Sequence, residues 1–177
     1  MRIRTKMYKP PGMLSTGLQL CVGALVMLAG CDSARGPAPL PPGITFEVHA
    51  IAAPDAKNTI QLVDPNLGAP IALEMVPIVD SGDIATVELS KLEIDSANGN
   101  SDTVQPSLNV ELTPNGATKM SAGTQQLQGQ TIAVVINGAI VSTPRVVVPI
   151  RGSFRITGDF NDQPFLDAIH TITDQNP

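Results

Sequence analysis

Two histidines are the side chains of this 177-residue chain best suited to acid–base chemistry. His49 falls in an alternating apolar run, and His170 lies near the end of the last helical pattern. A hydrolase would need one of them beside carboxylates in a pocket, because a general base must lie within hydrogen-bond reach of its proton. The closely spaced Asp80 and Asp83 are instead predicted to be turn and cap residues. We therefore expect both histidines to be structural, at the surface or half-buried, and predict no catalytic residue.

Ser153 follows Gly152, but no second glycine stands where a nucleophile elbow requires one. Gly152 and Gly158 also lack the spacing and the following lysine of a phosphate-binding loop. We expect Ser153 to be a strand residue and the two glycines to permit a bulge and a turn. The sequence predicts neither a cofactor nor a small-molecule substrate.

One loop carries oxygen ligands at alternate positions, as a hard cation such as calcium prefers. Its spacing is not that of an EF-hand, and no glutamate closes it at the right place. A solvated loop is therefore the preferred interpretation, and no metal is predicted. The candidate ligands are Asp95, Asn98, Asn100 and Asp102.

Arg145, Arg151 and Arg155 form the one basic cluster of the chain and are expected on one face of the last strands. A solvated face is the preferred interpretation of this cluster. A patch for an acidic partner is the alternative.

Cys31 is the one site of covalent chemistry that the sequence predicts. Four basic residues lie within the first nine, and residues 14–28 are apolar, uncharged and shorter than the roughly 20 residues of a membrane span. The four residues from Leu28 to Cys31 resemble the lipobox of bacterial lipoproteins. The resemblance implies cleavage between Gly30 and Cys31 and acylation of the cysteine. An ordinary signal peptide or an uncleaved anchor, the alternatives, would need no cysteine there. Cys21 would leave with the signal, so no disulfide is predicted.

The charge balance bears on the partners. The chain has 11 basic and 16 acidic residues, and removal of residues 1–30 takes away four basic and no acidic ones, which leaves a net charge of −9. Such an acidic chain is a poor match for nucleic acid or anionic lipid. We expect attachment to the membrane through the acyl chains on Cys31. Asp32 resembles the inner-membrane retention signal of enterobacterial lipoproteins, so we expect a domain in the envelope that faces the periplasm.

Three segments follow from composition. Residues 1–30 are the expected lipoprotein signal peptide. Residues 31–43, with four prolines and two glycines, are the expected tether, and residues 44–177 the folded domain. Because aromatic residues make up only 3% of the chain, the core must be mainly aliphatic.

The first half of the domain is predicted to hold strands over 45–53 and 71–76. Between them, turn residues surround a short apolar patch, Ile60–Val63. Val79–Asp83 is a turn or a helix start, and Asp83 is a candidate cap for a helix or strand over 84–89.

The second half has sharper patterns. Ser107–Leu112 alternates strictly as a half-buried strand, and Thr113 with Pro114 predicts the start of a helix that ends near Gly129. Thr131–Ile136 is a buried strand, and Asn137-Gly138 predicts a type I′ turn. A return strand is predicted over Ala139–Val148, with Pro144 at an edge or bulge. A further strand is predicted over Ser153–Thr157, with Phe154 and Ile156 on one face. The last helix is expected to be capped by Asn161 or Asp162 and to bury Phe165, Ile169 and Ile172. Together they predict an α+β fold with helices packed on one face of an antiparallel-rich sheet.

Residues Asn109–Ile172 resemble the head subdomain of the first periplasmic domain of SecD, an accessory subunit of bacterial protein translocation. Residues 76–89 also resemble the segment that precedes this subdomain. The matching residues are, in order, Leu112-Thr113-Pro114-Asn115-Gly116-Ala117, then Thr124 and Gly129, then IAVVINGAIVSTP from Ile132 to Pro144, then Ile150 and Gly152, and last Ile156-Thr157-Gly158 and Phe160.

SecD carries its proton-coupled work on transmembrane helices after this region, and we expect no second apolar span here. The resemblance therefore implies the fold and the compartment and not the energy-transducing activity. The first interpretation is a non-catalytic, membrane-tethered module that binds a protein or an unfolded segment, related to protein export. A structural or assembly subunit of an envelope complex is the second, and a hydrolase the third.

Overall fold

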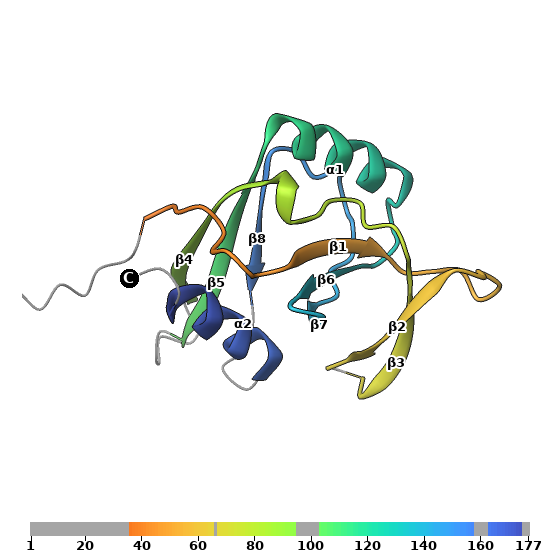
Figure 1. Cartoon of the computed structure of the whole chain (residues 1–177), viewed down its shortest axis with the longest axis horizontal. Helices are drawn as coiled ribbons and strands as arrows, with labels where there is room; N and C mark the ends of the chain where they lie inside the picture. Colours follow the sequence, from red (N-terminus) through yellow and green to blue (C-terminus); the bar gives the residue numbers. More distant parts are fainter. Residues whose placement is uncertain (1–35, 66, 95–102, 158–162, 175–177) are drawn as a thin grey trace, which may run out of the picture. The chain divides into compact units, whose positions relative to one another are not determined.

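A computed structural model describes residues 36–65, 67–94, 103–157 and 163–174 (Figure 1). These residues belong to the unit Ser33–Pro177. Its elements, in chain order, are β1 (Phe46–Ala50), β2 (Thr59–Asp64), β3 (Ala69–Glu74), the 3-10 helix η1 (Ser81–Asp83), β4 (Ile84–Ile94), β5 (Thr103–Leu112), α1 (Pro114–Gln126), β6 (Ile132–Ile136), β7 (Ala139–Ser142), β8 (Ser153–Thr157) and α2 (Gln163–Asp174).

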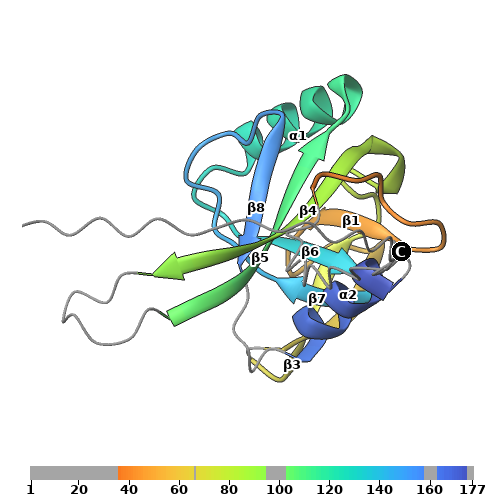
Figure 2. The same ribbon diagram turned by 90° about the vertical axis from the view of Figure 1, so that its left-hand side faces the viewer.

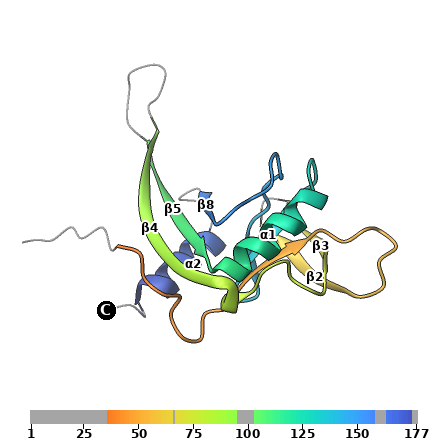
Figure 3. The ribbon, with the colours of Figure 1, turned by 90° about the horizontal axis from the view of Figure 1, so that it is seen from above.

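The strands pair antiparallel and are divided among three sheets, in the orders β1-β6-β7, β2-β3 and β4-β5-β8. The predicted α+β class is confirmed, with several small sheets in place of one. Helix α1 contacts η1 and β5, whereas α2 contacts β7. Figure 3 shows β4 and β5 running side by side as a long curved hairpin.

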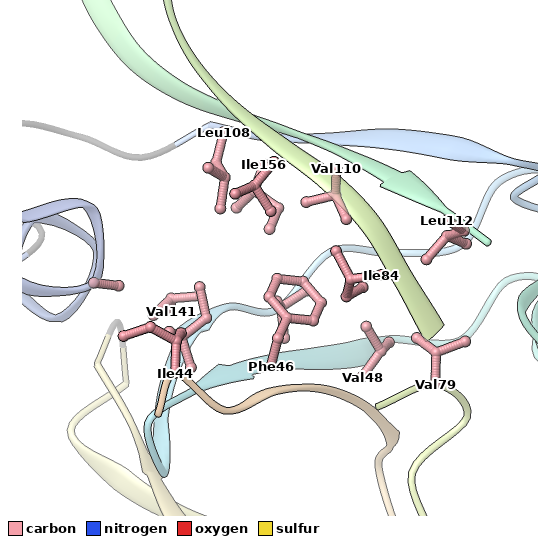
Figure 4. Packing of buried hydrophobic residues seen from close by; sticks show 14 of the residues in the cluster. Ile44, Phe46, Val48, Val79, Ile84, Leu108, Val110, Leu112, Val141 and Ile156 are labelled. Carbon is pink, nitrogen blue, oxygen red and sulfur yellow. The ribbon is translucent and has the colours of Figure 1, made fainter. Parts of the chain in front are cut away.

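The main core lies between the two three-stranded sheets. Figure 4 shows side chains of β4, β5 and β8 pointing toward those of β1 and its neighbours, such as Val110 toward Phe46. The rings of Phe46 and Phe154 lie 6.2 Å apart between centroids. A second cluster joins the other face of β6 to β3 through Ala133, Val135 and Leu73. Because both faces of β6 are covered, all five of its residues are buried and its sequence is continuously apolar.

The turn after β6 has the predicted geometry. Asn137 and Gly138 have φ angles of 50° and 78°, which suit the two central residues of a type I′ turn. The predicted return strand to Val148 is wrong in length, because β7 ends at Ser142. Pro144 follows without an N–H to donate, and beyond it the pairing resumes only as an isolated bridge between Arg145 and Thr131. Val147 and Val148 beyond it are exposed.

Two further expectations are corrected in the first half. The patch at Ile60–Val63 is part of strand β2, which pairs along its whole length with β3. Residues 84–94 form a strand, and Asp80, not Asp83, is the N-cap of the short helix before it. The pattern alone could not choose helix or strand there, and the long pairing with β5 decides for strand.

Helix α1 begins as predicted, whereas Asn161 and Asp162, the predicted caps of the last helix, lie outside the described residues. The Thr113 side chain accepts a hydrogen bond from the N–H of Gly116, and Pro114 occupies the first turn of α1. Helix α1 ends at Gln126, and Gly129 follows with a φ of 80°. Helix α2 buries Phe165 and Ile172 against the main core, with Ile169 packed beside them.

Candidate binding surface

The two histidines lie in different surroundings. His49 is almost fully buried on β1, more than expected, whereas His170 is exposed on α2. The Nδ1 atom of His49 lies 2.8 Å from the carbonyl oxygen of Glu74, and its Nε2 atom lies 3.3 Å from a carboxylate oxygen of Glu47. Its ring thus links β1 to β3. Neither histidine lines the three main hollows of the described surface.

The paired carboxylates build a cap and an ion pair between the buried Asp83 and the exposed Lys119. Asp80 accepts a hydrogen bond from the Gly82 N–H, and the Asp80 N–H donates to Asp83, which completes a capping box. The buried Asp83 carboxylate also accepts bonds from Lys119, with an N–O distance of 2.8 Å, and from Asn115 on α1. These side chains fix the start of α1 to the start of β4.

This network sets the ionisation of Asp83. Desolvation by burial opposes the charged form, but the hydrogen bond from Lys119, the bond from the Asp80 N–H, the Lys119 charge and the Asn115 bond together hold the Asp83 pKa below its ordinary value of 3.8. The hydrogen bond to Asp83 also raises the pKa of Lys119. The ionised Asp83 carboxylate therefore holds the start of α1 in place through Lys119 and Asn115.

Several residues that carry the SecD resemblance have structural roles. A Cβ atom at Gly116 would lie 2.5 Å from the carbonyl oxygen of Asp83, so only glycine permits this approach of α1. Thr124 is fully buried, and its hydroxyl accepts a bond from the Ile150 N–H while donating to Met120. Gly152 has a φ of 66°. These residues maintain the architecture.

The other candidates are placed as follows. Ser153 is an exposed residue of β8, as expected. The candidate cation ligands Asp95, Asn98, Asn100 and Asp102 lie outside the described residues, as do Cys31 and Gly158. Over the described ranges, no three His, Cys, Asp or Glu side chains cluster as metal ligands, and no helix is long and apolar enough to cross a membrane.

One edge of the sheet β4-β5-β8 is covered by the end of the predicted tether. Ala38 and Val87 of β4 form a reciprocal antiparallel pair: the Ala38 N–H donates to Val87 at 3.0 Å and the Val87 N–H donates to Ala38 at 2.7 Å. Leu40 packs against the core, and Pro41 is buried. The chain therefore contacts the domain before residue 44.

The prolines beside Ala38 terminate this added edge. In an antiparallel pair, alternate residues direct their N–H and C=O groups to the partner, so those of residues 37 and 39 point away from β4. Both of these residues are proline and have no N–H to donate. A further strand could not form a regular ladder with this edge.

The other edge of the sheet is the outer side of β8, beyond β5 (Figure 2). The Leu112 N–H donates to Gly152, and the same register pairs Val110 with Phe154 and Leu108 with Ile156. By alternation, the N–H and C=O groups of Arg155 and Thr157 point outward. Over the described residues, the strand partner of β8 is β5 alone.

A hollow of about 150 Å³ lies along this open edge. Both inward and outward residues of β8 line it, so it follows the strand edge and not one face of the sheet. Its other walls come from α1, β6, the end of β7 and the segment before β8. The lining residues are Met120, Ile132, Val134, Ser142, Pro144, Ile150, Phe154, Arg155, Ile156 and Thr157.

Two of the three predicted arginines bond to neighbouring elements. Arg155 donates from Nε to Asn109 at 2.7 Å, and Arg145 donates from Nε to the carbonyl of Gly129. Arg155 lines the hollow, and Arg145 and Arg151 directly follow Pro144 and Ile150, which also line it. All three are exposed. Of the three, Arg155 is the one that lines the hollow at the open edge of β8, whereas the Arg145 side chain is held at Gly129.

These features define an α+β domain of antiparallel sheets with one covered and one open edge. Residues 62–165 match the protein family described as SecDF, P1 head subdomain, which is more than half of the chain. The chain belongs to this family.

Two solved structures are similar to the chain. One, described as "Structure and function of a membrane component SecDF that enhances protein export", is 17% identical with a TM-score of 0.48; the match covers 77% of this chain and 63% of that chain. The other, "Crystal structure of SecDF in Super-membrane-facing form", is 18% identical with a TM-score of 0.45, over 70% of this chain and 17% of that chain. This chain thus matches less than two thirds of either. A comparison with curated proteins gives no match.

Two parts of this surface do not follow from the sequence patterns. One sequence feature indicates the pairing of the tether with β4, because Ala38 has the one main-chain N–H within a Pro-Ala-Pro run. The hollow had no signal, because its walls come from segments up to 37 residues apart in sequence that meet only through the fold.

Proposed function

We propose that this protein is a lipoprotein of the bacterial envelope, anchored by acyl chains on Cys31, whose SecD head-like domain faces the periplasm and binds protein without catalysis. Membership of the SecDF P1 head family over residues 62–165 carries the proposal. One similar protein is described as a membrane component that enhances protein export. We propose that the partner of this chain belongs to that process, and that Asp32 keeps the protein at the inner membrane.

The arrangement of side chains supports binding rather than catalysis. His49 and Asp83, the buried ionisable groups discussed above, are engaged in bonds that hold elements together. The open edge of β8, in contrast, carries main-chain groups directed outward beside an apolar hollow. Such an edge can accept an extended polypeptide as an additional strand.

The test has two parts. Cys31→Ser should abolish labelling of the protein by a radioactive fatty acid and leave the precursor uncut; unchanged labelling and migration would exclude the anchor. Crosslinking in cells expressing the wild-type chain should then capture a defined protein partner. Failure to capture any protein above a control without crosslinker would contradict the binding role.

A structural subunit of an envelope complex is the second candidate. Two exposed apolar pairs favour it, because permanent interfaces are more apolar than transient ones. Met75 and Val76 are 55% and 79% exposed, and Val147 and Val148 are 78% and 65% exposed. A partner that copurifies at fixed stoichiometry would support this candidate, whereas partners that exchange would support a transient module.

A further inference from the structure

We propose, on the basis of the proposed binding function, that the outer edge of β8 takes an extended polypeptide segment in which an aliphatic side chain is flanked by carboxylates. The segment would pair with the outward main-chain groups of Arg155 and Thr157. Its aliphatic side chain would enter the hollow beneath Phe154 and Ile156, and a neighbouring carboxylate would face Arg155.

The main-chain pattern requires an extended occupant. The N–H and C=O groups of Arg155 and Thr157 point outward, and their spacing of two residues is the repeat of an antiparallel ladder. Ser153, the third outward residue, uses its N–H locally, since it donates to Arg151 at 2.6 Å. The binding ladder therefore centres on two residues of β8.

The hollow specifies an aliphatic side chain. Six of its ten lining residues are apolar side chains of the main core or packed against it, including Met120, Ile132 and Ile156. A dry apolar cavity of about 150 Å³ can hold a molecule the size of benzene. A leucine or isoleucine side chain of a paired strand is of similar size and would be removed from water there.

The charge of the rim specifies acidic neighbours. Arg155 is one of the seven basic residues that follow residue 30, in a region with 16 acidic residues. It is the one charged residue among the ten that line the hollow. A local positive field on an acidic protein attracts carboxylates and repels basic segments.

The competing edge of the same sheet does not meet these requirements. Ala38 already occupies β4 at Val87, and the prolines at 37 and 39 leave no outward N–H there. A strand that adds to this sheet therefore finds outward N–H donors at β8 and none at the covered edge beside β4.

The experiment measures binding of a fluorescein-labelled peptide of nine alternating glutamate and isoleucine residues to the full chain in detergent micelles. Two matched peptides serve as controls: one has lysine in place of glutamate, and the other carries N-methyl groups on alternate main-chain nitrogens. The acidic peptide should bind, and the other two should bind at least about tenfold more weakly, because each lacks the charge match or the ladder donors.

Three variants locate the site. Thr157→Pro should weaken binding of the acidic peptide about tenfold by removing an outward donor, whereas Val63→Ala, at an exposed position on β2 outside the hollow, should leave it unchanged within about twofold. Arg155→Gln, which can still donate to Asn109, should weaken it about threefold. Circular dichroism of each variant should match that of the wild-type chain.

Absence of acidic-peptide binding, preference for the lysine peptide, or unchanged affinity in both Thr157→Pro and Arg155→Gln would overturn the inference. If the lipidated chain still captures a protein partner in cells after such a result, the proposed function stands and this site alone is excluded. If neither peptide nor partner binds, both fail.

Discussion

The two edges of the sheet β4-β5-β8 differ in what the sequence offers to an additional strand. At β4, a short segment of the same chain pairs at Ala38 and presents prolines outward. At β8, the outward groups belong to Arg155 and Thr157, beside an apolar hollow. Proteins commonly protect sheet edges with proline, with charge or with a covering segment. Here one edge has a covering segment and prolines, which leaves the other edge as the one that can accept a strand.

The largest expected effect on stability comes from Gly116, where helix α1 approaches the main chain of Asp83. Gly116→Ala should lower the free energy of unfolding by about 2 kcal/mol, because the new methyl group would meet the main chain of Asp83. Urea denaturation of the two proteins measures this difference.

Gly123→Ala is the matched control on the same helix. Its methyl group would meet a side-chain atom of Ile78, which can shift, and alanine favours the helix. We expect a loss under about 1 kcal/mol. Equal losses in the two variants would contradict the contact with Asp83 as the cause.

Loss of the Asp83–Lys119 ion pair at the start of β4 should have the second largest effect on stability. Asp83→Asn should cost about 1–2 kcal/mol at neutral pH, since a charge-assisted bond to Lys119 is replaced by a neutral one. Because the folded pKa of Asp83 lies below its ordinary value, its contribution is present above about pH 4 and is lost as pH falls through the folded pKa.

The stabilities of the wild-type chain and Asp83→Asn should therefore converge in acid, as measured by urea denaturation across pH. Asp80→Asn is the control, because asparagine is as good an N-cap as aspartate. A constant difference between wild type and Asp83→Asn down to low pH would exclude ionisation of Asp83 as the source.

The covered edge should be sensitive to proline. Ala38→Pro removes the N–H that donates to Val87 and should cost about 1 kcal/mol. The Val87 N–H, which donates to Ala38, should exchange its hydrogen faster. Ala38→Val retains the pair and should leave exchange at Val87 slow; rapid exchange in the wild-type chain would show that this edge is not covered in solution.

The open edge should tolerate the same substitution, which is the smallest expected effect. Thr157→Pro removes an N–H that points out of the sheet, so the free energy of unfolding should change by less than about 0.5 kcal/mol. A loss as large as that of Ala38→Pro would mean that the Thr157 N–H has a partner within the domain.

Local patterns predicted much of this fold. The strict alternation of Ser107–Leu112, the cap at Thr113 and the Asn137-Gly138 turn are each fixed within a few residues, and the structure confirms them. Strand β2 and the end of β7 were not predictable in this way, because pairing with β3 and exposure after Pro144 depend on tertiary context.

The candidate surface was predictable only in part. Arg145, Arg151 and Arg155 were recognised as a basic cluster, and Pro144 was placed near an edge. The meeting of Pro144 and Arg155 around one hollow depends on the contact of β6, β7 and α1 with β8, which sequence spacing does not encode. The predicted cation loop and lipidation site lie outside the described residues and stay predictions.

Site-specific photocrosslinking in cells tests the central claim most directly. A benzophenone amino acid would replace Thr157 at the open edge or Pro39, also exposed, at the covered edge. The account predicts a defined protein adduct from position 157 and little or none from position 39. Adducts from position 39 alone, or equal adducts from both positions, would contradict the claim that β8 is the binding edge.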